Sequence, residues 1–239
     1  MKAFLESDAF GALSSLDIQG NPLGRDGGEA FATNTHVNSL RHLWINNIGD
    51  AGVVALSTSS SLERLESLAL GFLKGELSED AVISLANSNV TANLRSLSLT
   101  GAVTDVGVKS IAKSTMTGNL RRLSLSGDIS GEGIEALAVS ERLSGLWQLK
   151  LDLCPIGDRG ASAIANSDSL RNLIDLQIAF CKLTENGSRI LAQSDNVRSL
   201  RWISLNRELI RPWLDSPNTS EVLKARVRAI ESAGHTGES

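Results

Sequence analysis

The fold is decided by a stretch that runs from Leu149 to Gly160 and reads LKLDLCPIGDRG. Its first half alternates apolar and polar residues, which predicts a short strand with one buried face. Its second half begins with Ile156 and Gly157 and continues with Asp158. A small cap residue followed by an acid is typical of the first turn of a helix. We therefore predict a strand, a turn and a helix in succession.

The strand half of this unit recurs along the chain. The pattern L-x-x-L-x-L, with Ile allowed in place of Leu, occurs at intervals of 25 to 29 residues. One unit of this length cannot bury its own apolar face, so stacked units must share a continuous core. The eight units begin at Leu13, Leu40, Leu65, Leu94, Leu120, Leu146, Leu173 and Leu200.

The helix half is equally regular in the first seven units. A Gly, Ser or Thr follows the apolar residue at the end of each turn, and we predict that it caps the helix. These caps are Gly24, Gly49, Ser78, Thr104, Ser130, Gly157 and Thr184. A glycine inside a helix costs about 1 kcal/mol relative to alanine, so its recurrence predicts close packing against a neighbouring turn. These glycines are Gly27, Gly52, Gly107, Gly133, Gly160 and Gly187. Helix ends are marked by Ser59, Ser88, Ser114, Ser140, Ser167 and Ser194.

On these residues the chain resembles leucine-rich-repeat proteins over about residues 13–210. The unit at 149–160 is similar to the ribonuclease-inhibitor-like and cysteine-containing subclasses, and to bacterial arrays with I-G-D-x-G-A-x-A-L-A strings. The resemblance implies an α/β fold in which about eight repeats form a right-handed curved solenoid. Parallel strands would line the concave face and helices the convex face.

The resemblance also implies an Asn or Cys at a ladder position three residues after the strand. Four residues fit this expectation, namely Asn21, Asp128, Cys154 and Cys181, whereas Leu73, Ala102 and Glu208 depart from it. The spacing between strand and helix is longest in the third unit, so we predict a bulge around residues 73–75.

The two ends differ from the repeats. We predict a single domain over residues 1–239, in which 1–12 form the helix of a partial repeat and 13–210 the eight repeats. No polar cap precedes residues 1–12, so either they cap the solenoid or the chain is cut from a longer array. Residues 211–239 are predicted to form a C-terminal capping helix and tail, opened by a capping box from Asn218 to Glu221.

Composition excludes several classes of function. The chain has 23 basic and 27 acidic residues, mixed along its length, for a net charge of −4. This charge argues against binding to nucleic acid or to an anionic membrane. No apolar run approaches the roughly 20 residues of a membrane span, and the acids at positions 6 and 8 make a poor signal peptide. Only two cysteines are present, so we predict a cytoplasmic protein in a reducing compartment.

Catalytic motifs find little support in the sequence. The three histidines, His36, His42 and His235, have no metal-ligand or triad spacing, and no phosphate-binding glycine loop occurs. We predict a protein that is not an enzyme and carries no cofactor. Cys154 and Cys181 lie one repeat apart and could form a redox pair, a metal site or two buried ladder thiols. We favour the ladder thiols, because two ligands are too few for zinc and free cysteines are commonly buried.

The candidate functional residues flank the buried strand leucines and are predicted to face the concave side. Aromatic residues and arginine are typical interface anchors. The predicted partner-binding residues are Trp44, Arg122, Lys150, Asp152, Asp175 and Trp202. The alternative is a solvated sheet face with two partly packed tryptophans. We predict a non-catalytic scaffold that binds a protein partner there. The other possibilities are the substrate-recognition module of a larger enzyme, such as a ubiquitin-ligase receptor or effector, and an enzyme with a site in the trough.

Overall fold

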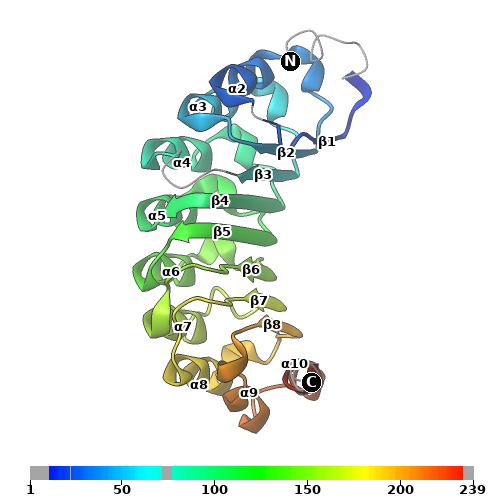
Figure 1. The fold of residues 1–239 in the computed structure, drawn as a ribbon. Coiled ribbons are helices and arrows are strands. Elements are labelled where there is room, and N and C mark those ends of the chain that lie inside the picture. Colours follow the sequence, from blue (N-terminus) through cyan, green and yellow to red (C-terminus); the bar gives the residue numbers. More distant parts are fainter. Residues whose placement is uncertain (1–10, 22, 72–76, 234–239) are drawn as a thin grey trace.

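The computed structural model describes residues 11–21, 23–71 and 77–233, and within them eight strands form one parallel sheet in chain order (Figure 1). This arrangement confirms the predicted α/β solenoid. The strands are β1 Ser15–Asp17, β2 His42–Asn46, β3 Ser67–Gly71, β4 Ser96–Thr104, β5 Arg122–Asp128, β6 Gln148–Lys150, β7 Asp175–Gln177 and β8 Trp202–Ser204.

Each of the first seven strands is followed by a helix. Figure 1 shows these helices in a row along the convex side of the arc, with the strands along the concave side. They are α2 Gly24–Thr33, α3 Gly49–Ser57, α4 Glu79–Ala86, α5 Asp105–Lys113, α6 Gly131–Ala138, α7 Gly157–Ala165 and α8 Glu185–Gln193. Short 3-10 helices are η2 Thr35–Val37, η3 Ser60–Leu62, η4 Asn89–Thr91, η5 Thr115–Thr117, η6 Glu141–Leu143, η7 Asp195–Val197 and η8 Arg207–Leu209.

Strand pairing places equivalent leucines side by side. Leu97 of β4 pairs with Leu123 of β5, and Leu123 pairs with Leu149 of β6. All three side chains are at most 1% exposed. Along each strand, the residues before and after the leucine point to the other face, because the side chains of strand neighbours alternate. The leucines therefore form a continuous column that runs through the core, as the repeat predicted.

Strands β4 and β5 are longer than the repeat predicts. Their register shifts between Leu99 and Val103, after which Val103 pairs with Gly127 and Thr104 with Asp128. Gly127 has φ +152°, and a Cβ there would lie 2.2 Å from the Val103 carbonyl oxygen, so only glycine lets the strands approach. The prediction that Asp128 is a ladder residue is wrong, because the strand continues to it and leaves it exposed.

The helix starts are of two kinds. The side chains of Ser78, Ser130 and Thr184 accept hydrogen bonds from backbone N–H groups of the first turn, as predicted for N-caps. The glycines do not act as N-caps. Gly24, Gly49 and Gly157 are instead the first residues of their helices, with φ near +60°. Their role is to supply a left-handed turn that a side chain would disfavour.

Thr104 is also not a side-chain cap. Its hydroxyl donates to Glu79 of the preceding repeat at 2.9 Å.

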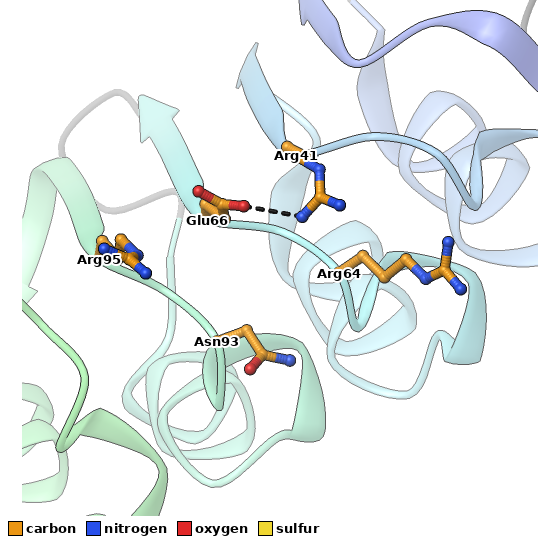
Figure 2. A pocket seen from close by; sticks show the side chains of 5 residues that line it. All are labelled: Arg41, Arg64, Glu66, Asn93 and Arg95. Atoms are coloured by element: carbon orange, nitrogen blue, oxygen red, sulfur yellow. Dashed lines mark hydrogen bonds and ion pairs between the residues drawn. The ribbon is translucent and has the colours of Figure 1, made fainter.

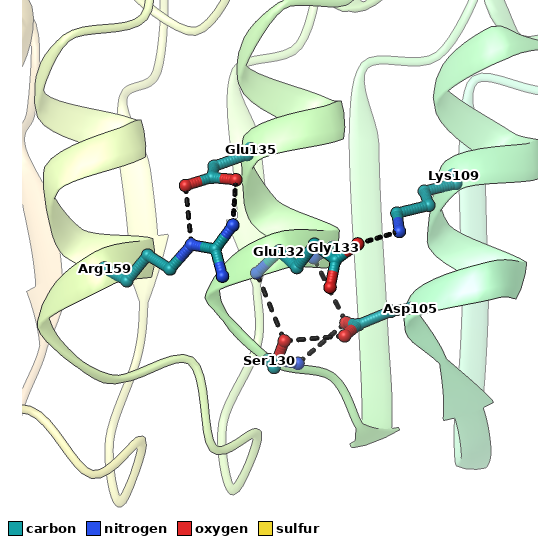
Figure 3. Close-up of polar contacts among 7 residues, drawn as sticks. All are labelled: Asp105, Lys109, Ser130, Glu132, Gly133, Glu135 and Arg159. Carbon is teal, nitrogen blue, oxygen red and sulfur yellow. Dashed lines mark hydrogen bonds and ion pairs between the residues drawn. The ribbon is translucent and has the colours of Figure 1, made fainter.

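Acids in the first helical turn bind the next repeat. The Asp105 carboxylate accepts hydrogen bonds from Ser130 N, Ser130 Oγ and Gly133 N at 2.8, 2.6 and 3.1 Å (Figure 3). Asp158 accepts from the N–H and hydroxyl of Thr184 in the same way. A Cβ at position 133 would lie 2.5 Å from Asp105 Oδ1, which confirms the predicted close approach at this glycine. These acids thus join adjacent repeats, beyond the dipole role predicted for them.

Serines at the helix ends also join the repeats. Each hydroxyl donates to the carbonyl of the last alanine in the helix of the preceding repeat, at 2.8 Å for Ser59 and 2.6 Å for Ser140. These serines are largely buried, so each bond also satisfies a polar group that has left water. Ser88 differs, because its Oγ accepts from Val90 N. The donor–acceptor pairs are Ser59–Ala32, Ser114–Ala86, Ser140–Ala112, Ser167–Ala138, Ser194–Ala165 and Ser216–Ala192.

After β8 the chain forms two further helices, α9 Arg211–Asp215 and α10 Glu221–Ala233. Trp213 of α9 is fully buried, and its Nε1 donates to Ser188 Oγ at 3.0 Å. The predicted capping box is wrong, because the hydroxyl of Ser220, and not the Asn218 side chain, accepts from Leu223 N. The predicted bulge at 73–75, residues 1–10 of the helix predicted over 1–12, and the tail from 234 lie outside the described residues.

Replacing Leu123 with Ala is expected to lower the free energy of unfolding by about 2–5 kcal/mol, because it opens a cavity in the leucine column. Leu153→Ala removes the same atoms from a side chain that is 71% exposed, so its effect should be close to zero. Chemical denaturation followed by circular dichroism measures both. Equal losses for the two variants would contradict the shared core.

Candidate functional site

Strand pairing brings four of the six predicted partner-binding residues onto neighbouring strands, and a fifth, Asp152, lies in the turn after β6. Arg122 pairs with Gln148, Gln148 with Asp175, and Asp175 with Trp202. Lys150 lies in the next row, beside Ser124 and Gln177, and Asp152 follows it. We call Arg122, Lys150, Asp152, Asp175 and Trp202 the β5–β8 patch.

Trp44 does not belong to this group. It lies in β2, three strands away from β5, which corresponds to about 14 Å at the usual spacing of strands. Its ring stacks on His42, with centroids 5.9 Å apart and planes inclined by 19°. The structure therefore separates Trp44 from the β5–β8 patch.

Both carboxylates of the patch have a side-chain partner. Gln148 Nε2 donates to Asp175 Oδ2 at 2.5 Å, and Lys150 Nζ lies 3.6 Å from Asp152 Oδ2. The other Asp152 oxygen accepts from Ala179 N at 2.9 Å. Asp152 thus also holds the turn after β7, whereas the Lys150 head group stays half-exposed.

Trp202 of the patch and the neighbouring Trp147 each lie beside a cation. The Arg122 guanidinium lies 6.0 Å from the ring centroid of Trp147, and Arg226 of α10 lies 5.1 Å from that of Trp202. Cations at this distance are attracted by the ring face. Trp202 remains 44% exposed despite this cover. Trp147 was missed by sequence reasoning, because it precedes its strand by one residue.

Two exposed apolar residues on the turns after β6 and β7 were also missed. Leu153 and Phe180 are 71% and 66% exposed and have φ of +67° and +57°. Left-handed backbone is unfavourable for bulky side chains. The same position of the repeat is also left-handed at Gly20, Asn47, Gly101 and Gly127. Leu153 and Phe180 could have been found from the sequence, because they stand where other repeats have glycine or asparagine.

The two cysteines are free and buried. The thiol of Cys154 lies 3.5 Å from the Leu125 carbonyl oxygen, and that of Cys181 lies 3.0 Å from the Leu151 carbonyl oxygen. Burial raises the pKa of Cys154 to about 11 and that of Cys181 to about 12. Their contacts are those of ladder thiols that bridge adjacent repeats.

Among the residues that the structure describes, no three His, Cys, Asp or Glu side chains are grouped as a metal ion requires. The helices of the same part of the chain are all too short or too polar to cross a membrane.

Comparison with known proteins agrees with this geometry. The family model described as Leucine Rich repeat matches residues 13–32 and 148–165, which contain β1 with most of α2 and β6 with α7. No curated protein matches the chain. The chain therefore carries leucine-rich repeats, and its fold is a leucine-rich-repeat solenoid. Domains of this kind are generally protein-interaction modules.

The thiols of Cys154 and Cys181 are expected to react slowly in the native protein and rapidly in denaturant, because they are buried and protonated. Timed labelling with a thiol reagent, read by intact mass, measures both rates. Rapid labelling of the folded chain would contradict their place in the core.

The same thiols predict a loss of stability at alkaline pH. Above an ordinary thiol pKa of 9.0, the unfolded chain releases protons that the native chain keeps until about pH 11 to 12. The free energy of unfolding should therefore fall as the pH rises through this range. A Cys154→Ala/Cys181→Ala variant should show a shallower fall, and identical slopes would count against this explanation.

Proposed function

We propose that this protein is a non-catalytic scaffold that binds a protein partner on the β5–β8 patch and on the adjoining turns. The observation that carries the proposal is the pair Leu153 and Phe180. Both residues have bulky side chains and a left-handed backbone, which is strained. Neither side chain is buried, so burial does not offset the strain. Apolar side chains held in water in this way are suited to contact with a partner.

The β5–β8 patch supplies complementary chemistry beside these two residues. Trp202 offers a large apolar ring, and aromatic rings and arginine are the commonest sources of binding energy at interfaces. Arg122 and Lys150 are exposed, so they can steer and orient a partner of opposite charge. The small side chains of β3 and β4 offer no such anchors, which favours the C-terminal half of the sheet.

Lys150→Glu and Trp202→Ala are expected to weaken binding by roughly 1–4 kcal/mol, because they reverse a charge and remove a ring of the surface. The measurement is quantitative capture of partners from the source cell, followed by titration of the captured protein. Lys113→Glu, an exposed charge reversal at the end of α5 on the convex side, is the control. If Lys113→Glu alone weakens binding, the partner uses the helices.

Arg226→Ala separates the binding role of Trp202 from its packing role. It removes the cation that covers the ring but leaves the ring in place. Binding should be retained or tightened. Loss of binding in Arg226→Ala with retained binding in Trp202→Ala would show that the site lies on α10.

Phe180→Asn is expected to weaken partner binding without loss of stability. Asparagine tolerates left-handed backbone better than phenylalanine does, and it already occupies the equivalent position 47. Val139→Asn is the control, since Val139 is 78% exposed after the convex helix α6. Thermal melts and titration together test this prediction. An unfolded Phe180→Asn variant would mean that the ring has a structural role.

A further inference from the structure

We propose a second binding site, for an acidic polypeptide segment, where the strands of repeats two to four begin. Five side chains surround an open hollow of about 310 Å³ at this edge of the sheet. They are Arg41, Arg64, Glu66, Asn93 and Arg95, which we call the arginine hollow (Figure 2).

The arginine hollow carries unmatched positive charge. Arg41 Nη1 contacts Glu66 Oε1 at 2.7 Å, so the charges of these two side chains cancel. Arg64 and Arg95 are exposed, and neither has an ion-pair partner among the residues that the structure describes. The hollow therefore has two free guanidinium groups, although the chain as a whole has a net charge of −4. A local charge opposite to that of the whole chain favours an anionic ligand at this edge.

The backbone beneath these side chains is held rigidly. Glu66 N donates to the Arg41 carbonyl at 2.7 Å, and Arg95 N donates to the Glu66 carbonyl at 2.8 Å. Asn93 Nδ2 donates to the Glu63 carbonyl at 2.8 Å, which orients its amide. Arg41, Glu66 and Arg95 occupy equivalent positions of successive repeats, so Arg41 and Arg95 start about 10 Å apart. The backbone that carries Arg41 and Arg95 is thus held at a fixed spacing.

The lining favours carboxylates over a nucleic acid. Guanidinium groups bind carboxylates and phosphates alike through two parallel hydrogen bonds, so the other lining residues decide between the two. The five lining residues include no aromatic ring, which binding of single-stranded nucleic acid uses to stack bases. Glu66 also stands between Arg41 and Arg95, where it would repel a continuous phosphate backbone. A polypeptide can place separated carboxylates on either side of Glu66.

This site is independent of the proposed function. It lies at the start of β2 to β4, whereas the β5–β8 patch lies on the concave face of later repeats. A negative result at the arginine hollow leaves the β5–β8 patch untouched, since the two tests use different variants and probes.

The test uses the full chain and a labelled ten-residue peptide of alternating Glu and Gly, with a Gln–Gly peptide as the neutral probe. Fluorescence anisotropy at low and moderate salt gives the affinities. The Glu peptide should bind at least about tenfold more tightly than the Gln peptide. Arg64→Ala/Arg95→Ala should lower the affinity for the Glu peptide about tenfold, as expected for loss of charge-assisted hydrogen bonds. Salt should weaken binding of the unmodified chain more than that of the variant.

The matched control is Arg142→Ala/Arg171→Ala. It removes the same charge from exposed arginines of later repeats, outside the hollow, and should keep the affinity for the Glu peptide. Equal loss in both double variants, or equal binding of the two peptides, would overturn the proposal. A labelled oligothymidine that binds more tightly than the Glu peptide, and is lost in the Arg64→Ala/Arg95→Ala variant, would also overturn it in favour of nucleic acid.

Discussion

Every other feature of this molecule depends on the in-register pairing of one repeat with the next. Backbone hydrogen bonds run from each strand to its neighbour, so residues separated by about one period become direct neighbours. The leucine column, the serine bonds to alanine carbonyls and the bonds accepted by Asp105 and Asp158 all use this spacing. Each polar bond contributes about 0.5–1.5 kcal/mol, and the repetition adds them along the whole solenoid.

Repetition also separates structural residues from those available for binding. Where a position has the same inward contact in several repeats, as at Ser140 and Ser167, its chemistry is used to hold the stack together. Where the residue type changes and the side chain is exposed, it can contact a partner. Phe180 replaces a glycine or asparagine at a left-handed turn, and Arg64 and Arg95 are exposed and have no ion-pair partner within the described part of the chain. The exposed turn residues Leu153 and Phe180 are breaks in the pattern of this kind.

The two edges of the sheet differ in how they use charge. Where the helices start, Asp158 accepts hydrogen bonds from Thr184, and despite the opposing effect of burial these bonds and those from Asn186 and Gly187 lower its pKa. Its carboxylate is thus hydrogen-bonded by the next repeat. At the opposite edge, Arg64 and Arg95 keep their charge exposed. Charge is thus hydrogen-bonded within the protein at one edge and exposed at the other, where we propose the second binding site.

The sequence by itself determined the repeat, the strand and helix of each unit and the buried leucines, because these follow from local periodicity and from the need to bury one face. It also predicted ladder positions for Cys154 and Cys181, which the structure buries in the turns. The partner-binding role of the β5–β8 patch stays a prediction. Only the tertiary structure decided that Asp105 bonds to the next repeat, that β5 continues to Asp128 and that Leu153 faces water. The physical reason is that these outcomes depend on which residues stand beside one another after strands 25 to 29 residues apart have paired.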